Sequence, residues 1–173
     1  MRVLLSEQQI QERIREIATQ IHTDYEGKKP ILIGILKGSF VFLSDLIREL
    51  EMELEVDFMA TSSYGDATTS SGVVQLTKDL DVAIEGRDVI IVEDIVDTGL
   101  TLRYLRQLLL QRFPASLAVC TLLDKSARRQ VEVPVDYCGF DIEDGFVVGY
   151  GIDYAQKYRQ LRFVAIIEED FNE

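Results

Sequence analysis

A short stretch of this chain, from Glu93 to Thr101, combines carboxylates, hydroxyl groups and a glycine. The adjacent carboxylates of Glu93 and Asp94 are suited to hold a sugar hydroxyl or a hydrated Mg²⁺. Gly99 lets the backbone approach a ligand closely, and Thr98 and Thr101 add hydroxyl groups. These residue types in this order predict a ligand-binding loop.

The residues around this loop predict a strand before it and a helix after it. Residues 89–92 are a β-branched run, which is typical of a strand buried in a parallel sheet. An amphipathic helical pattern follows, with apolar positions at Leu102, Leu105, Leu108, Leu109 and Phe113, and Pro114 would end it. The first N–H groups of a helix favour an anion, so the loop is expected to bind phosphate. The alternative is that Glu93 and Asp94 form only a solvated turn.

The sequences of two other phosphate-binding loops, G-x-G-x-x-G and G-x-x-x-x-G-K-[ST], are absent from the chain.

The rest of the chain supplies the elements that would position the central loop. Ser6 begins a capping-box pattern, and the helix after it has isoleucine along one face, at Ile10, Ile14, Ile17 and Ile21. Further strands are expected over 31–36, 54–59, 73–76, 116–123, 135–140, 146–151 and 163–167, with a helix over 40–50.

Two segments between these elements have both an ordinary and a functional interpretation. Lys37-Gly38-Ser39 follows a predicted strand and could be a simple turn. Residues 60–72 are rich in Thr, Ser, Gly and Asp, and they form either a mobile surface loop or a functional one. Lys125 stands at the carboxyl end of a predicted strand, where open α/β sheets bind their ligands.

Composition narrows the class of protein. The chain has 173 residues, 47% of them hydrophobic, and only 3 prolines, which predicts a single domain over 1–173. A net charge of −12 argues against a nucleic-acid partner. No signal peptide or membrane-spanning run is recognised, so a cytoplasmic protein is expected. Cys120 and Cys138 are expected to be reduced thiols in the core, and His22, the only histidine, to lie at the surface.

Two motifs resemble a known family. Val92-Glu93-Asp94-Ile95-Val96-Asp97-Thr98-Gly99-Leu100-Thr101 resembles the donor-binding signature of the phosphoribosyltransferases, and Phe146-Val-Val-Gly-Tyr-Gly-Ile-Asp-Tyr154 is similar to the base-binding hood of the hypoxanthine-guanine members, bacterial type. The resemblance covers nearly the whole chain. It implies the type I phosphoribosyltransferase fold, an α/β fold in which a mainly parallel twisted sheet is flanked by helices and carries a small hood. It also implies purine salvage: transfer of the 5-phosphoribosyl group from phosphoribosyl pyrophosphate to N9 of hypoxanthine or guanine, giving IMP or GMP and pyrophosphate.

The same resemblance implies a role for each matching residue. Ribose and its 5′-phosphate would be bound by Glu93, Asp94, Ile95, Val96, Asp97, Thr98, Gly99, Leu100 and Thr101. Pyrophosphate would meet Lys37, Gly38, Arg129 and Arg159, and a lid containing Ser63 and Tyr64 would close over the site. The purine would contact Lys125, Phe146, Val147, Ile152 and Asp153. Mg²⁺ would be ligated by Asp153, Glu93 and Asp94, and Asp97 would be catalytic, handling the proton at purine N7.

Some features depart from the family or leave its function open. Ser39 replaces a glycine that is often found in the pyrophosphate loop, and Leu100 stands where relatives often have a polar or small residue. Arg128 is interpreted as surface charge. The expected partners are the donor and 6-oxopurine bases, in a homodimer or homotetramer, without nucleic acid or membrane. The alternatives are a donor-sensing regulator that binds nucleic acid, and an enzyme for xanthine and guanine or for a pyrimidine.

Overall fold

The computed structural model describes residues 1–63 and 74–168. Its main sheet has six strands in the order β4-β3-β2-β5-β6-β7. Only the edge strand β4 runs antiparallel to its neighbour, and the other pairs are parallel. In sheet order the strands are β4 Val74–Lys78, β3 Glu55–Ser63, β2 Ile31–Leu36, β5 Asp88–Val96, β6 Ser116–Asp124 and β7 Tyr137–Asp141.

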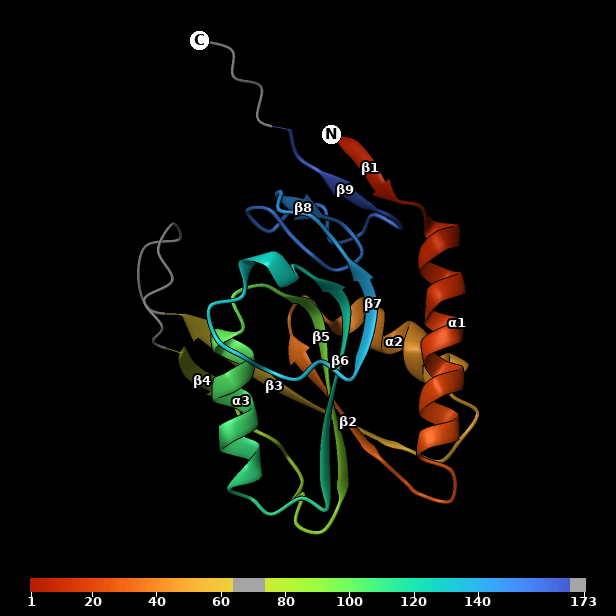
Figure 1. Cartoon of the computed structure of the whole chain (residues 1–173), viewed down its shortest axis with the longest axis vertical. Helices are drawn as coiled ribbons and strands as arrows, with labels where there is room; N and C mark the ends of the chain where they lie inside the picture. Colours follow the sequence, from red (N-terminus) through yellow and green to blue (C-terminus); the bar gives the residue numbers. More distant parts are fainter. Residues whose placement is uncertain (64–73, 169–173) are drawn as a thin grey trace.

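Helices cover both faces of this sheet, because successive side chains of a strand point to opposite sides. Helices α1 (Glu7–Asp24) and α2 (Phe40–Glu49) pack in one hydrophobic cluster with Leu32 and Ile90. Helix α3 (Leu100–Leu110) packs in a second cluster with Ile31 and Ile91. Figure 1 shows α1 and α3 on opposite sides of the strands. The mainly parallel, helix-flanked sheet predicted from the sequence is therefore confirmed.

A small second sheet forms the hood above the main sheet (Figure 1). Its strands are antiparallel and lie in the order β1-β9-β8, with β1 Arg2–Leu5, β9 Val164–Ile166 and β8 Val147–Val148. The strand at the N-terminus was not predicted from the sequence. It pairs Arg2 with Ile166, so both ends of the described chain contribute to the hood.

Several predicted boundaries are wrong. Strand β5 continues through Val96, so Glu93 and Asp94 lie in the strand and not in a loop after it. Helix α3 ends at Leu110, and Phe113 lies beyond it with a φ of 55° and 73% of its surface exposed, so it is not part of the apolar helix face. Strand β3 extends to Ser63, which shortens the predicted polar loop.

Other local predictions are confirmed. The capping box at the start of α1 is present, and Ile10, Ile14, Ile17 and Ile21 are fully buried. Both cysteines are free, but only Cys120 is buried in the core; Cys138 is half-buried, and burial raises the pKa of its thiol to about 11. His22 is exposed. In residues 1–63 and 74–168 no helix has the length and apolar character needed to cross a membrane.

The cap of α1 joins the hood to the rest of the fold, which makes it a useful test of stability. Gln9 N donates to Ser6 Oγ at 3.1 Å, and Ser6 N donates to Gln9 Oε1 at 2.8 Å. We expect Ser6→Ala to lower the free energy of unfolding by about 1 kcal/mol, because it leaves a helix N–H without its acceptor. Urea unfolding measures the change. Gln8→Ala, on the same exposed turn, is the control, and equal midpoints for the two variants would contradict the prediction.

Candidate active site

The predicted functional residues converge because three parallel strands end at one edge of the sheet. Strand β2 ends next to Lys37, β5 leads into the Asp97–Thr101 loop, and β6 ends next to Lys125. Parallel pairing of β2 with β5 and of β5 with β6 places these carboxyl ends side by side. Open α/β sheets bind ligands at this edge.

The loop between β5 and α3 has the geometry expected of a phosphate site. Gly99 is the N-cap of α3 with a φ of 88°, a left-handed conformation that favours glycine. Glycine has no side chain to cap the first amides of the helix, so these N–H groups are suited to an anion. A pocket of about 110 Å³ lies here, lined by Glu93, Ile95, Val96, Asp97, Thr98, Gly99, Thr101 and Leu102.

Neighbouring backbone fixes the shape of this loop. Lys125 N donates to Val96 O at 2.9 Å, and Gln130 N donates to Thr98 O at 2.9 Å. The Arg129 guanidinium donates to Asp97 O and to Asp124 Oδ1, each at 2.8 Å. The segment that follows β6, from Lys125 to Gln130, therefore holds this loop in place. The pyrophosphate contact predicted for Arg129 remains a prediction, and in this structure its guanidinium is engaged by the central loop.

The two adjacent carboxylates are in an unusual electrostatic setting. Glu93 is 7% exposed, and burial together with the neighbouring Asp94 carboxylate raises its pKa well above the usual range. Burial also raises the pKa of Asp94, although hydrogen bonding to Ile95 N at 2.7 Å opposes this. Two negative charges in this buried place raise the free energy of the protein unless a cation or a hydroxyl group stabilises them. The pair is therefore suited to bind such a ligand.

Glycine contacts bring the pyrophosphate loop and the hood against this acidic pair. Gly38 packs so closely on Asp94 that a Cβ there would collide with the carboxylate, and a Cβ on Gly151 would collide with Gly38 O. Gly151 has a φ of 95°. The peptide bond between Leu36 and Lys37 is cis. Strand β5, the Lys37–Gly38 loop and the hood are thus stacked in direct contact.

Arg159 is held in the hood beside this stack. Its guanidinium donates to Gly151 O at 2.7 Å and pairs with Asp153 Oδ1 at 3.3 Å. Its charge also lowers the pKa of Asp94, against the effect of burial. Asp153 Oδ2 accepts from Gln156 N at 2.8 Å. The predicted pyrophosphate and metal residues of the hood therefore lie together.

Lys125 and Phe146 form the candidate base site. Lys125 is 9% exposed, and its ammonium donates to Gly145 O at 2.7 Å. Phe146 is 52% exposed and meets the Tyr154 ring edge-on at 5.2 Å. It is therefore not a core residue and can stack on a planar ligand. Val147 and Ile152 have buried side chains in the core, so their backbone groups are what they can offer a base.

A Mg²⁺ ion fits the oxygen donors at this edge only with help from a substrate. In the described ranges no group of three or more His, Cys, Asp or Glu residues is placed to hold a metal ion. The predicted set of Glu93, Asp94 and Asp153 is therefore not a preformed cage. Magnesium is commonly held by one or two carboxylates plus substrate phosphates, and the Asp94 carboxylate against Gly38 suits that mode.

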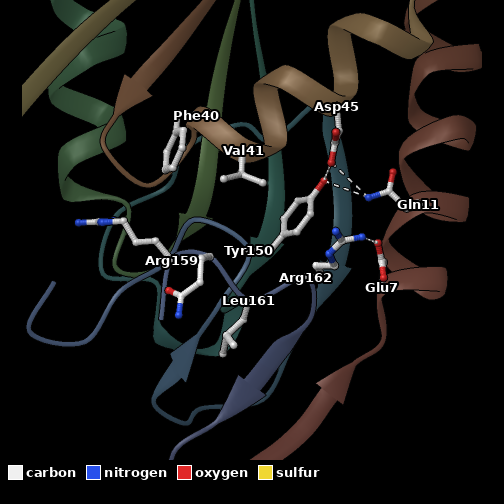
Figure 2. Close-up of a pocket in the computed structure, with 10 residues that line it drawn as sticks. Glu7, Gln11, Phe40, Val41, Asp45, Tyr150, Arg159, Leu161 and Arg162 are labelled. Carbon is white, nitrogen blue, oxygen red and sulfur yellow. Dashed lines mark hydrogen bonds and ion pairs between the residues drawn. The ribbon is translucent and has the colours of Figure 1, made fainter. Parts of the chain in front are cut away.

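A larger pocket, of about 620 Å³, lies beside the hood (Figure 2). It lies between the hood and the first turns of α1 and α2, and Arg159 lines one side of it. Figure 2 shows Tyr150 pointing toward Asp45 and Gln11, with which its hydroxyl is hydrogen-bonded. This pocket contains none of the central-loop residues, so its size does not make it the candidate active site.

Some predicted and unpredicted residues need separate mention. Ser63 ends β3 at the same edge of the sheet, whereas Tyr64 lies outside the described residues. Sequence reasoning dismissed Arg128 as surface charge, but its Nε donates to Asp97 Oδ1 at 2.7 Å. Asp144, which also pairs with Arg128, was not predicted at all. No sequence signal marks either contact, because the partners are far apart in the chain.

The stacked glycines generate a prediction with a matched control. Gly151→Ala should lower the affinity for phosphoribosyl pyrophosphate, the ligand that the resemblance implies, about tenfold or more, because the new Cβ must push Gly38 away from its position. Gly27→Ala is the control: its φ is 74°, and a Cβ there meets none of the described atoms within 4 Å. Titration calorimetry measures both affinities. Equal affinities for Gly151→Ala and the parent protein would show that the hood does not fix the position of the Lys37–Gly38 loop.

Comparison with known proteins places this chain in a family. The sequence pattern of the phosphoribosyl transferase domain matches residues 3–155. The chain is 50% identical over 172 residues to a hypoxanthine phosphoribosyltransferase of Haemophilus influenzae, with 96% of each chain covered. It is 48% identical over 169 residues to the bifunctional protein TilS/HprT of Listeria monocytogenes. This match covers 98% of this chain but only 26% of the Listeria protein. The chain thus spans about a quarter of that longer protein.

The fold agrees with solved structures of the same kind. A crystal structure of a hypoxanthine-guanine phosphoribosyltransferase from Bacillus anthracis, with a HEPES molecule in its active site, matches with a TM-score of 0.93 at 49% identity. The match covers 97% of this chain and 99% of that one. The resemblance inferred from the two motifs is confirmed, and the chain belongs to the phosphoribosyl transferase domain family, with hypoxanthine-guanine phosphoribosyltransferases as its relatives.

Proposed function

We propose that this protein is a purine salvage enzyme that transfers the 5-phosphoribosyl group of phosphoribosyl pyrophosphate to N9 of hypoxanthine or guanine, giving IMP or GMP. The observation that carries the proposal is the meeting of two dissimilar sites at one sheet edge. One is the helix N-terminus at Gly99, which suits a phosphate, and the other combines buried Lys125 with exposed Phe146. A protein that only sensed the donor would not need the second site.

Phosphoribosyl pyrophosphate fits along the carboxyl edge of the main sheet, and its groups follow the order of the strands. The α3 amides and the threonine hydroxyls bind the 5′-phosphate, and Glu93 and Asp94 accept hydrogen bonds from ribose hydroxyls. Pyrophosphate lies toward Lys37, Gly38 and the hood. Asp153, Glu93 and Asp94, together with phosphate oxygens of the substrate, would hold a Mg²⁺ ion, which would supply positive charge to offset that of the leaving pyrophosphate. This charge is needed because the chain itself carries a net −12.

The base fits between the hood and the central loop. Phe146 stacks on the ring, and Lys125 donates to the exocyclic oxygen. An ammonium has three donors, of which Gly145 O takes one. N9 of the purine forms the bond to C1′ as the bond from C1′ to pyrophosphate breaks, and Asp97 accepts the proton from N7. Atoms and charges then balance, and the pyrophosphate leaves with the bonding electrons.

We further propose that residues 1–173 act as one domain in a cytoplasmic homodimer or homotetramer. Both sheets share one continuous hydrophobic cluster that includes Leu5, Ile14 and Val164, which supports a single domain. The exposed apolar side chains of Phe40 and Phe113 support an oligomer, because association of subunits would remove such surfaces from water.

An assay with a panel of bases tests the function. Purified protein, Mg²⁺ and phosphoribosyl pyrophosphate are mixed with hypoxanthine, guanine, xanthine, adenine or uracil, and nucleotide and pyrophosphate are quantified. We expect turnover with hypoxanthine and guanine, little with adenine, and none after exhaustive chelation. Rapid conversion of adenine or uracil would assign the protein to another base, and no nucleotide from any base would reject the enzyme.

The selection against adenine generates a prediction for Lys125. Adenine carries a donor where oxopurines carry an oxygen, so its amino group faces the ammonium without an acceptor. Lys125→Met keeps the apolar stem of the side chain and removes its hydrogen-bond donors, and we expect turnover with hypoxanthine and guanine to fall about 10²-fold or more. The affinity for phosphoribosyl pyrophosphate, measured by calorimetry, should stay within about twofold. A variant with parental oxopurine turnover would show that another group selects the base.

A further inference from the structure

The Arg128 guanidinium lies between two carboxylates from distant parts of the chain. Its Nε donates to Asp97 Oδ1 at 2.7 Å, and its Nη1 pairs with Asp144 Oδ2 at 3.1 Å. The guanidinium lowers the pKa of Asp144. One planar group therefore joins the central loop to the segment that leads into Phe146.

The short 3₁₀ turn Ser126–Arg128 sets this position. It follows β6 directly, and Arg128 N donates to Lys125 O at 2.9 Å. Lys125, at the start of the same turn, donates to Gly145 O and approaches Asp144 Oδ1 at 3.9 Å. Two cations from one turn thus anchor the Asp144–Gly145 segment, and only Arg128 of the two also contacts Asp97.

We propose that Arg128 is a positioning residue that aligns the Asp97 carboxylate with the base pocket formed by the hood. This inference rests on the proposed function, in which Asp97 accepts the proton at N7. Because Nε bonds Oδ1 at 2.7 Å, the guanidinium restricts the rotation of the Asp97 carboxylate. The bond to Asp144 fixes the same guanidinium relative to the stacking ring of Phe146.

The effect of this bridge is on geometry and not on global stability. Side chains of Arg128 and Asp97 are nearly half exposed, and exposed ion pairs contribute little to the free energy of unfolding. A planar guanidinium can bond two carboxylates at fixed angles, whereas the ammonium of lysine is a single point charge. The distance between proton acceptor and base therefore depends on arginine itself at this position.

The experiment compares single-turnover rates with hypoxanthine in Arg128→Ala, Arg128→Lys and the parent enzyme. We expect Arg128→Ala to lower the rate about tenfold, the scale seen when a group that orients a functional side chain is removed. Arg128→Lys should recover only part of the loss. Donor affinity should stay within about twofold in both. Arg112→Ala is the matched control, because Arg112 pairs with Asp79 at 2.7 Å away from the site and its loss should leave the rate unchanged.

A double mutant separates alignment of Asp97 from other effects. In an Asp97→Asn background, already slowed about 10²-fold, Arg128→Ala should change the rate less than about twofold. An equal tenfold loss in both backgrounds, a parental rate in Arg128→Ala, or a parental rate in Asp97→Asn would each overturn the inference. These failures are distinct from failure of the proposed function, which would appear as absence of nucleotide product with the parent enzyme.

Discussion

The structure depends on the parallel pairing of β2, β5 and β6. Since side-by-side parallel strands end at the same edge, Lys37, the Asp97 loop and Lys125 meet although they are far apart in sequence. The strands are buried on both faces by two hydrophobic clusters, which holds their register. Register decides where the strand ends lie, so the core that holds the register also sets the spacing between the sites proposed for phosphate, sugar and base.

Close backbone contacts transmit this spacing to the hood. Gly38 rests on Asp94, and Gly151 rests on Gly38, so that no side chain can be inserted between the three segments. These contacts, together with the shared hydrophobic cluster, hold the hood and its antiparallel strands against the parallel sheet. The glycines matter here for their lack of a Cβ, and at Gly151 also for its left-handed backbone.

The charges at the site are mostly paired within the protein. Among the described residues, Arg128, Arg129 and Arg159 each contact a carboxylate, and buried Glu93 has a raised pKa. In an acidic chain, the proposed anion binding would then rely on backbone amides and on a divalent cation more than on excess basic side chains. This pairing also gives the arginines fixed orientations, which a positioning role requires.

Local sequence determined the helix cap at Ser6, the buried strands and the strand–loop–helix order around Gly99, because each depends on residues close together in the chain. Its motifs also identified the family, and the roles that they imply for the site residues stay predictions. Tertiary structure alone decided that β5 continues past Glu93, that Arg2–Leu5 joins the hood, and that Arg128 contacts Asp97 and Asp144. These features depend on partners distant in sequence, and the periodicity of one segment carries no information about which strand or side chain it will meet.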